Sequence, residues 1–198
     1  MEFHGLNLNE YLLIIEPEPG VRQQIQSLKR LFKQRHRFEN AIITKAHLTL
    51  MRCLQYESYE RLIVRKLEAI SATVAPFGVE LQGFGNFGHA LYIDVKNRSP
   101  ILDIVSNRKA ELRPYVYSKN RGTPFFVTKP HITIARRLTP TQCDMAWAIW
   151  SRIPYNGGFR AKEMLLLKRR VGTNAYRSVR RFTFGGPVPR LTQGKLFN

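Results

Sequence analysis

Hydrophobic residues along the chain follow two periods, one typical of strands and one typical of helices. Short apolar runs predict seven strands, at residues 11–16, 42–50, 77–81, 91–95, 129–136, 164–168 and 176–184. Apolar residues spaced three or four apart predict helices at 21–37, 59–70, 99–112 and 139–150. Because strands and helices alternate along the whole chain, the pattern predicts an α+β fold.

Capping and turn residues mark several boundaries. Ser99 followed by Pro100 predicts a helix start with serine as the N-cap, and residues 139–142 form a capping box. The pair Gly157-Gly158 predicts the end of the last helix. A loop between two strands is indicated by three further glycines, Gly83, Gly85 and Gly88.

A short motif recurs within this order of elements. Lys-Ala-His-Leu-Thr-Leu at 45–50 returns as Lys-Pro-His-Ile-Thr-Ile at 129–134, which places His47 and His131 84 residues apart. A tyrosine follows each histidine at equal distance, Tyr92 and Tyr176. The predicted strands and helices also repeat, with strand 91–95 shared by both copies. Self-similarity at a fixed offset predicts a duplicated unit with pseudo-two-fold symmetry.

The two motifs carry chemistry because side chains alternate between the faces of a strand. His47 and Thr49 share one face, as do His131 and Thr133, while the aliphatic residues between them point to the other. Symmetry brings the two polar faces together in a cleft. Neutral and protonated imidazole are both available near neutral pH, so the pair can serve as base and acid in metal-free phosphodiester cleavage. The threonine hydroxyls can donate to phosphate oxygens.

Composition and charge support an anionic ligand. Hydrophobic residues make up 43% of the 198, enough for a buried core, which excludes a disordered chain. The formal net charge is +18, and +15 of it lies in residues 100–198. Such a basic domain typically meets nucleic acid, nucleotides or an anionic membrane, although a basic surface can also serve solubility alone. Five arginines near the last two strands are predicted to follow a nucleic-acid backbone: Arg169, Arg170, Arg177, Arg180 and Arg181.

Two distant cysteines, Cys53 and Cys143, and the lack of a targeting segment or a membrane-length apolar run predict a reduced, cytoplasmic protein that does not enter a membrane. We predict neither a metal nor a cofactor, since two histidines are too few ligands and carboxylates are scarce in the second half. The remaining histidines receive no catalytic role: His4, His36 and His89.

The paired motif resembles that of the two-histidine (2H) phosphoesterase superfamily, and within it the bacterial RNA 2',3'-cyclic phosphodiesterases, historically called 2'-5' RNA ligases. The resemblance covers residues 11–184. It implies a duplicated, two-lobed fold with antiparallel sheets flanking a central cleft and helices outside. It also implies an N-terminal extension at 1–10, one bilobal domain at 11–184 and a C-terminal tail at 185–198.

Further site residues follow from this resemblance. Arg136, five residues after His131, resembles the family arginine that contacts phosphate or base. Tyr176 and the loop carrying Phe87 resemble substrate-contacting segments. Lys45 and Lys129 each precede a motif histidine by two residues, so alternation points them to the histidine face. They either line the cleft or are solvated lysines at the strand ends. The first strand lacks the aromatic residues of some relatives, so Phe87, Phe125 and Phe126 are candidates for stacking on a base, with core packing as the alternative.

The resemblance therefore predicts a monomeric phosphodiesterase that opens 2',3'-cyclic phosphate ends of RNA or nucleotides, with ligation as the reverse reaction. We predict His131 as the base that activates water and His47 as the acid, and the reversed roles stay open. Two alternatives also stay open. One is a non-catalytic nucleotide or RNA-binding module, and the other is a 2H enzyme for 2'-5' oligonucleotides or small cyclic nucleotides.

Overall fold

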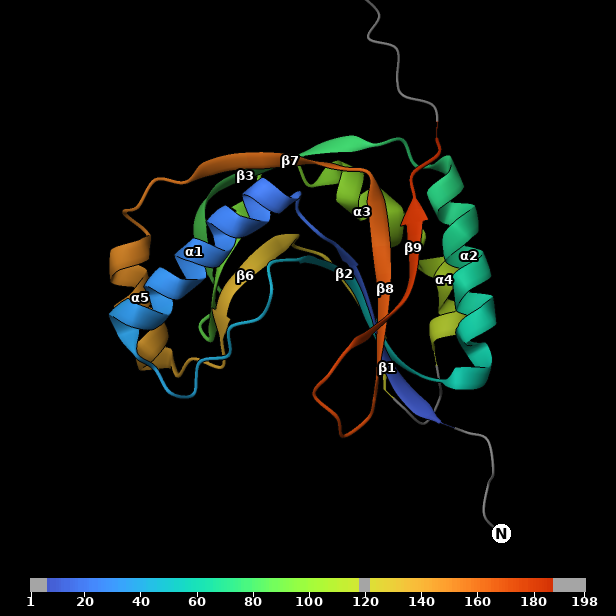
Figure 1. Ribbon diagram of the computed structural model, residues 1–198, viewed down its shortest axis with the longest axis horizontal. Coiled ribbons are helices and arrows are strands. Elements are labelled where there is room, and N and C mark those ends of the chain that lie inside the picture. The colour runs from blue at the N-terminus through green and yellow to red at the C-terminus, as the bar shows by residue number, and fades with distance from the viewer. Residues whose placement is uncertain (1–6, 118–121, 187–198) are drawn as a thin grey trace, which may run out of the picture.

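The computed structural model describes residues 7–117 and 122–186 (Figure 1). The helices are α1 (Pro19–His36), α2 (Glu60–Thr73), α3 (Ser99–Val105), α4 (Lys109–Val116) and α5 (Pro140–Trp150), with a 3-10 turn, η1, at Glu57–Tyr59. The strands are β1 (Leu8–Ile15), β2 (Leu48–Tyr56), β3 (Phe77–Asn86), β4 (Ala90–Val95), β5 (Phe125–Phe126), β6 (His131–Arg136), β7 (Asn156–Ala161), β8 (Glu163–Arg170) and β9 (Arg177–Thr183). No helix in these ranges is both long and apolar enough to cross a membrane.

The strands form one open antiparallel sheet in the order β7-β3-β4-β6-β2-β1-β8-β9, with β5 pairing beside β2. Its two halves meet between β6 and β2, where Leu48 pairs with Ile132. Outward from this pair the halves match strand for strand, β4 with β1, β3 with β8 and β7 with β9. This order confirms the predicted pseudo-two-fold duplication, within one continuous sheet.

Helices cover each half separately (Figure 1). Helices α1 and α5 pack on β7, β3, β4 and β6, which we call lobe A, and α2, α3 and α4 pack on lobe B, which holds β2, β1, β8 and β9. Each lobe buries one sheet face under its helices. The aliphatic residues of both motifs are fully buried there: Leu48, Leu50, Ile132 and Ile134. Burial of such a side chain contributes about 1.5–3 kcal/mol.

Some predicted boundaries are wrong. The run 42–50 is not one strand: Ile42 makes an isolated bridge to Arg136, and β2 begins only at Leu48. The predicted helix 99–112 is split into α3 and α4, and its first helical residue, Ser99, makes no capping hydrogen bond because Arg98 occupies the N-cap. Gly157 and Gly158 lie inside β7. The capping box at Thr139 is confirmed.

Candidate active site

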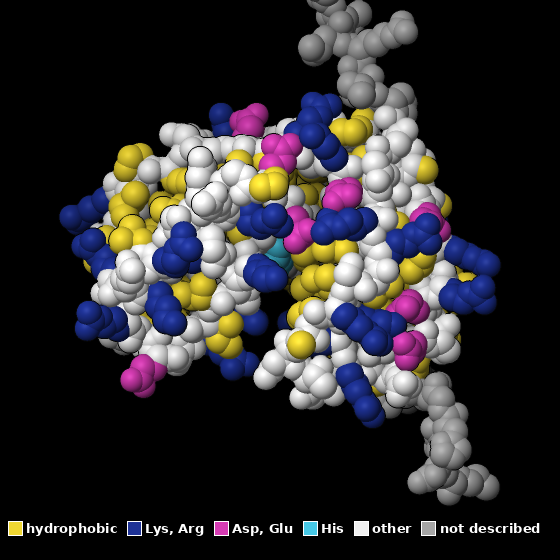
Figure 2. All heavy atoms as spheres, in the orientation of Figure 1, with side chains coloured by type: hydrophobic (Ala, Val, Ile, Leu, Met, Phe, Trp, Pro, Cys, Tyr) yellow, Lys and Arg dark blue, Asp and Glu magenta, His cyan; other side chains and the backbone are white. Residues whose placement is uncertain are grey.

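The two histidine motifs meet at the centre of the sheet. Leu48 faces Ile132 in an antiparallel pair, so the register places His47 beside Thr133 and His131 beside Thr49. Residues opposite each other in such a pair share a face. The four polar side chains are partly exposed while their aliphatic neighbours are buried. Figure 2 shows a hollow between the lobes with a histidine on its floor and Lys and Arg around it.

Both imidazoles are fixed by the same local hydrogen bond. His47 Nδ1 lies 2.8 Å from the carbonyl oxygen of Lys45, and His131 Nδ1 lies 2.7 Å from that of Lys129. A carbonyl only accepts, so each Nδ1 carries the hydrogen and Nε2 is the nitrogen free to exchange a proton. The two lysines thus contribute backbone oxygens, which the sequence prediction missed. Their side chains differ, since that of Lys45 is exposed and that of Lys129 half-buried.

Each histidine also has a carboxylate on the adjacent strand. Asp94 of β4 is in register with His131, and Glu16 follows Ile15, which pairs with Leu48, so it lies beside His47. An arginine holds each carboxylate at 2.8 Å, Arg98 for Asp94 and Arg181 for Glu16.

The charges around the two imidazoles differ. Burial lowers the pKa of both histidines below its ordinary value, and the hydrogen-bonded carbonyls partly oppose this. At His131 the next influence is Asp94, which raises the pKa, ahead of Lys129, which lowers it. At His47 two cations, Lys29 and Arg136, lower the pKa ahead of Glu16, which raises it. The charges therefore favour the proton on His131 over His47.

Lys29 is a cation within the core, missed because it sits on an amphipathic helix with many basic residues. Its side chain is 1% exposed and its Nζ donates to the carbonyl of Thr44 at 2.8 Å, three residues before His47. Burial lowers the pKa of Lys29 to about 8, which leaves it charged at neutral pH. It therefore anchors the irregular segment leading to His47 and adds positive potential there.

Within residues 7–117 and 122–186, an aromatic cluster flanks His131 and not His47. Phe87 stacks on Tyr92 with ring centroids 4.3 Å apart, and its ring lies edge-on to His131 at 5.0 Å. Lys129 Nζ lies 5.5 Å and 5.0 Å from the centroids of the Phe87 and Tyr92 rings. Phe87 is 38% exposed, so it lies at the cleft margin as a ligand-contacting residue would.

Gly85 makes room for Tyr92, with which it pairs across β3 and β4. A Cβ at Gly85 would overlap the Tyr92 ring, which is 1% exposed and cannot turn away. We expect Gly85→Ala to lower the free energy of unfolding by about 1–3 kcal/mol, measured by urea denaturation. Gly78→Ala on the same strand, where a Cβ meets nothing within 4 Å, is the matched control. Equal midpoints for the two variants would contradict this account.

Both motif strands carry a bulge directly after the threonine. On β2, Ile14 pairs with Thr49 and Leu13 with Met51, so Leu50 is the extra residue. On β6, Tyr92 pairs with Thr133 and Leu91 with Ala135, so Ile134 is extra. The bulge returns Arg136, in register with Ala90, to the face of Thr133. The side chain of Arg136 is exposed, and its contact with phosphate or base stays a prediction.

Lobe B contributes an apolar floor to the same face. Leu12 and Ile14 of β1 pair with Leu167 and Leu165 of β8, and together with Tyr176 they form a cluster separate from the main core. The Tyr176 hydroxyl donates to Glu10 at 2.6 Å, and Arg169 lies 4.8 Å over its ring. Tyr176 is therefore part of the cleft wall, with its hydroxyl already bonded to Glu10.

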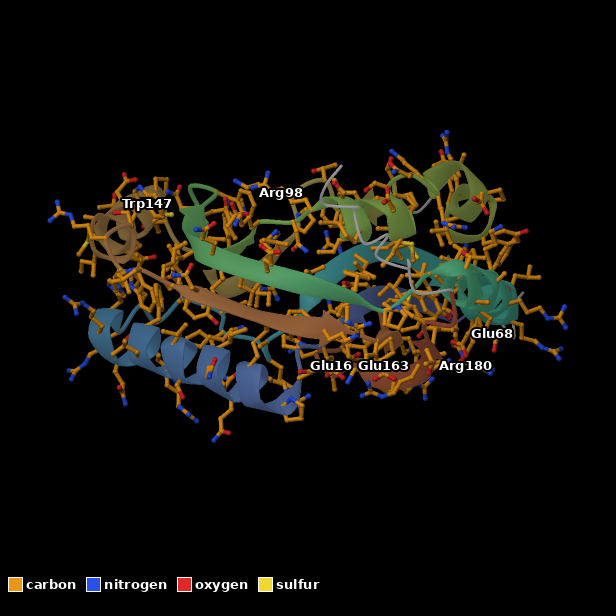
Figure 3. The ribbon with its side chains drawn as sticks, turned by 90° about the horizontal axis from the view of Figure 1, so that it is seen from above. Glu16, Glu68, Arg98, Trp147, Glu163 and Arg180 are labelled. Atoms are coloured by element: carbon orange, nitrogen blue, oxygen red, sulfur yellow. The ribbon has the colours of Figure 1, made fainter. Side chains whose placement is uncertain are left out.

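The predicted arginine cluster is largely paired with carboxylates. Arg169 contacts Glu10 at 2.6 Å, Arg177 lies 3.6 Å from Glu57, and Arg180 contacts Glu68 at 2.5 Å. Arg181 bridges Glu16 and Glu163, and Figure 3 shows these two carboxylates near each other and Arg180 near Glu68. Arg170 alone of the five has no ion pair within the described residues. The charge excess at these strands is thus mostly balanced locally, and its predicted role on an RNA backbone stays a prediction.

Two other features lie away from the paired motifs. A polar cavity of about 340 Å³ is lined by Asn9, Lys168, Arg170 and neighbours at the far end of β1 and β8. Asn9 is five residues from Ile14 beside the site, or about 17 Å along a strand.

The other two histidines that the structure describes, His36 and His89, have no catalytic environment. His36 accepts a hydrogen bond from the Trp150 indole at 3.0 Å, as a structural histidine does. His89 is exposed, His4 lies outside the described residues, and no cluster of three His, Cys, Asp or Glu side chains occurs within them.

The symmetric sheet with a His-Xaa-Thr motif at each side of its centre is the architecture of a two-histidine phosphoesterase. Residues 17–173 match the family model described as the 2'-5' RNA ligase superfamily, and the chain belongs to that superfamily. No curated protein sequence matches the chain significantly.

Solved structures share the fold. TT0787 of Thermus thermophilus aligns with a TM-score of 0.66 at 17% identity, covering 89% of this chain and 98% of that one. E. coli LigT complexed with 3'-AMP aligns with a TM-score of 0.63 at 14% identity, covering 90% and 98%. LigT complexed with NADP+ aligns with a TM-score of 0.57 at 18% identity, covering 90% and 99%. At these identities the likeness establishes the fold.

Proposed function

We propose that the protein is a metal-independent phosphodiesterase that opens 2',3'-cyclic phosphate ends of RNA by attack of water, with residues 11–184 acting as one bilobal domain. The observation that carries the proposal is the pairing of Leu48 with Ile132, which brings two imidazoles with free Nε2 atoms to one face of the sheet. Hydrolysis of a cyclic phosphodiester needs one proton removed from water and one delivered to a ribose oxygen. Two such imidazoles supply both transfers.

The charges around the histidines favour the opposite assignment of acid and base from the one predicted from sequence. A base must be neutral in the resting enzyme, and Lys29 and Arg136 disfavour a proton on His47. An acid must hold a proton, and Asp94 favours one on His131. We therefore assign His47 as the base and His131 as the acid. The negative charge of the bound phosphate also favours the protonated form of His131.

Three further groups hold the reacting phosphate. Thr49 and Thr133 lie beside the opposite histidine, so their hydroxyls can donate to the two non-bridging oxygens as charge builds there. Arg136 adds a positive charge from the same face. The ribose and base of the terminal nucleotide have an apolar floor in Leu12, Ile14 and Leu165 and an aromatic wall in Phe87. A 5'-hydroxyl in place of water would give 2'-5' ligation by the same transfers.

A substrate panel in the presence of EDTA tests this function. The wild-type protein is incubated with an RNA ending in 2',3'-cyclic phosphate, with a 3',5'-cyclic nucleotide and with a 2'-5' oligonucleotide, and products are followed by ³¹P NMR. We expect turnover of the cyclic-ended RNA and not of the other two, unaffected by EDTA. Tight binding of all three without turnover would support a binding module, and loss of activity in EDTA would point to a metal.

The pH dependence of kcat/KM reports the two histidines of the free enzyme. Because burial lowers both pKa values, we expect a bell-shaped profile centred below pH 6.5. Replacing Lys29 by Met removes a cation near His47, so the pKa of His47 rises. His47 then becomes protonated at a higher pH, and the acidic limb of the profile shifts to higher pH. Lys33→Met, exposed on the same helix, is the control. An acidic limb that stays fixed in Lys29→Met would contradict the assignment of His47 as the base, and movement of the basic limb instead would reverse the roles.

A further inference from the structure

Arg52 is the symmetry counterpart of Arg136. Each follows its motif histidine by five residues, so the two arginines are separated by the same 84 residues as the histidines. The bulge at Leu50 places Arg52 on the face of Thr49, because Arg52 pairs with Leu12 and Thr49 with Ile14, two residues along the same strand. The duplicated unit therefore presents a second arginine to the cleft.

The two arginines act on different neighbours. The charge of Arg136 lowers the pKa of His47, whereas Arg52 has no such effect on His131 and instead helps to lower the pKa of Glu10. Glu10 already accepts from Tyr176 and Arg169, both at 2.6 Å. Within the described residues the Arg52 guanidinium has no hydrogen bond and no ion pair. It is exposed and has its donors free for an external anion.

A pocket of about 190 Å³ adjoins this guanidinium. Its lining consists of Glu10, Arg52, Cys53, Leu54, Thr123 and Phe125. Phe125 pairs with Arg52 across β5 and β2 and therefore shares its face, and its ring is 42% exposed. The neighbouring pair, Met51 and Phe126, is buried on the opposite face. An unpaired guanidinium beside an exposed aromatic ring is a combination that binds a phosphate and stacks on a base.

The pocket lies close to the reacting centre along β2. Arg52 lies three residues beyond Thr49, or about 10 Å along the strand at most. Because Glu10 and Arg52 line the pocket together, a ligand held by the paired histidines that continues past its terminal nucleotide can extend into it.

We propose that Arg52 and Phe125 form a subsite for the penultimate nucleotide, so that the substrate is an RNA 3' end of two or more nucleotides. Arg52 binds the phosphate that joins the last two nucleotides, and Phe125 stacks on the penultimate base. This inference rests on the proposed function, since it extends the same cleft away from the cyclic end.

The test compares a dinucleotide ending in 2',3'-cyclic phosphate with the corresponding cyclic mononucleotide. We expect Arg52→Met to lower kcat/KM for the dinucleotide about 10- to 100-fold, the loss typical of a charge-assisted hydrogen bond, and for the mononucleotide at most about three-fold. Phe125→Leu should lower the dinucleotide value about ten-fold. Arg65→Met, exposed on the outer face of α2, should alter neither. Equal losses on both substrates, or none on either, would overturn the subsite.

A binding measurement separates this inference from the proposed function. Calorimetry with a dinucleotide 3'-phosphate and a mononucleoside 3'-phosphate requires no turnover. We expect Arg52→Met to weaken binding of the dinucleotide about ten-fold or more. The slope of log Kd against log salt concentration should fall by about one, the value for one lost phosphate contact. If that difference appears in a protein without hydrolytic activity, the subsite stands and the proposed function fails. If wild type binds the two ligands equally, the subsite is wrong whatever the activity.

Discussion

Replacing either motif histidine should abolish most hydrolysis while leaving the fold intact. We expect His47→Ala and His131→Ala each to lower kcat for a 2',3'-cyclic phosphate end by about 10²- to 10⁴-fold, the usual contribution of a general acid or base. The two imidazoles act on one transition state, so the double variant should be little worse than the poorer single one. Rates are measured by chromatography, with thermal melting to verify folding.

A control and a second substrate sharpen this prediction. His89 is an exposed histidine of lobe A, which also carries His131, and His89→Ala should retain activity within about two-fold. A phosphodiester with a phenolic leaving group needs no protonation, so it should restore activity to His131→Ala and not to His47→Ala if His131 is the acid. Full activity of either motif variant on the ribose substrate would remove that histidine from the mechanism.

Loss of a threonine hydroxyl should have the next largest effect. We expect Thr49→Val and Thr133→Val each to lower kcat by about 10²- to 10³-fold, as removal of one donor to a developing oxyanion does, with a smaller change in KM. The shape of the side chain is nearly preserved, so the fold should tolerate both. Steady-state kinetics on the cyclic-ended RNA separates kcat from KM.

Thr49→Ser and Thr133→Ser keep the hydroxyl and should retain most of the activity. Since the register places each threonine beside the opposite histidine, we expect similar losses for the two valine variants. A rise in KM without a fall in kcat would mean that the hydroxyls hold the ground state and transition state equally. Valine variants as active as wild type would exclude the threonines from phosphate binding.

The sequence predicted the polar face of the site because strand periodicity is local. His47 and Thr49 had to share a face once Leu48 was buried, and the repeat at 129–134 predicted the symmetry. The hydrogen bonds to the carbonyls of Lys45 and Lys129 were not predictable, because they depend on the backbone bend before each strand. That bend is also the reason why the predicted strand 42–50 is interrupted before Leu48.

The roles of charged residues were less predictable than the motif itself. The arginines of the last two strands appeared free in sequence, yet Arg180 contacts Glu68 and Arg181 contacts Glu16, more than 100 residues away in each case. Conversely, Arg52 shares the 84-residue offset of the histidines, so a systematic search at that offset would have identified it. Its face depends on the bulge at Leu50, which only the structure reveals.

Mass spectrometry in water enriched in oxygen-18 tests the central claim most directly. An RNA ending in 2',3'-cyclic phosphate is incubated in EDTA with wild-type protein or with the double variant in which His47 and His131 are alanine. We predict that wild type converts the RNA to a phosphomonoester carrying one heavy oxygen and that the double variant does not. An unchanged RNA with wild type, or equal conversion by both proteins, would contradict the account.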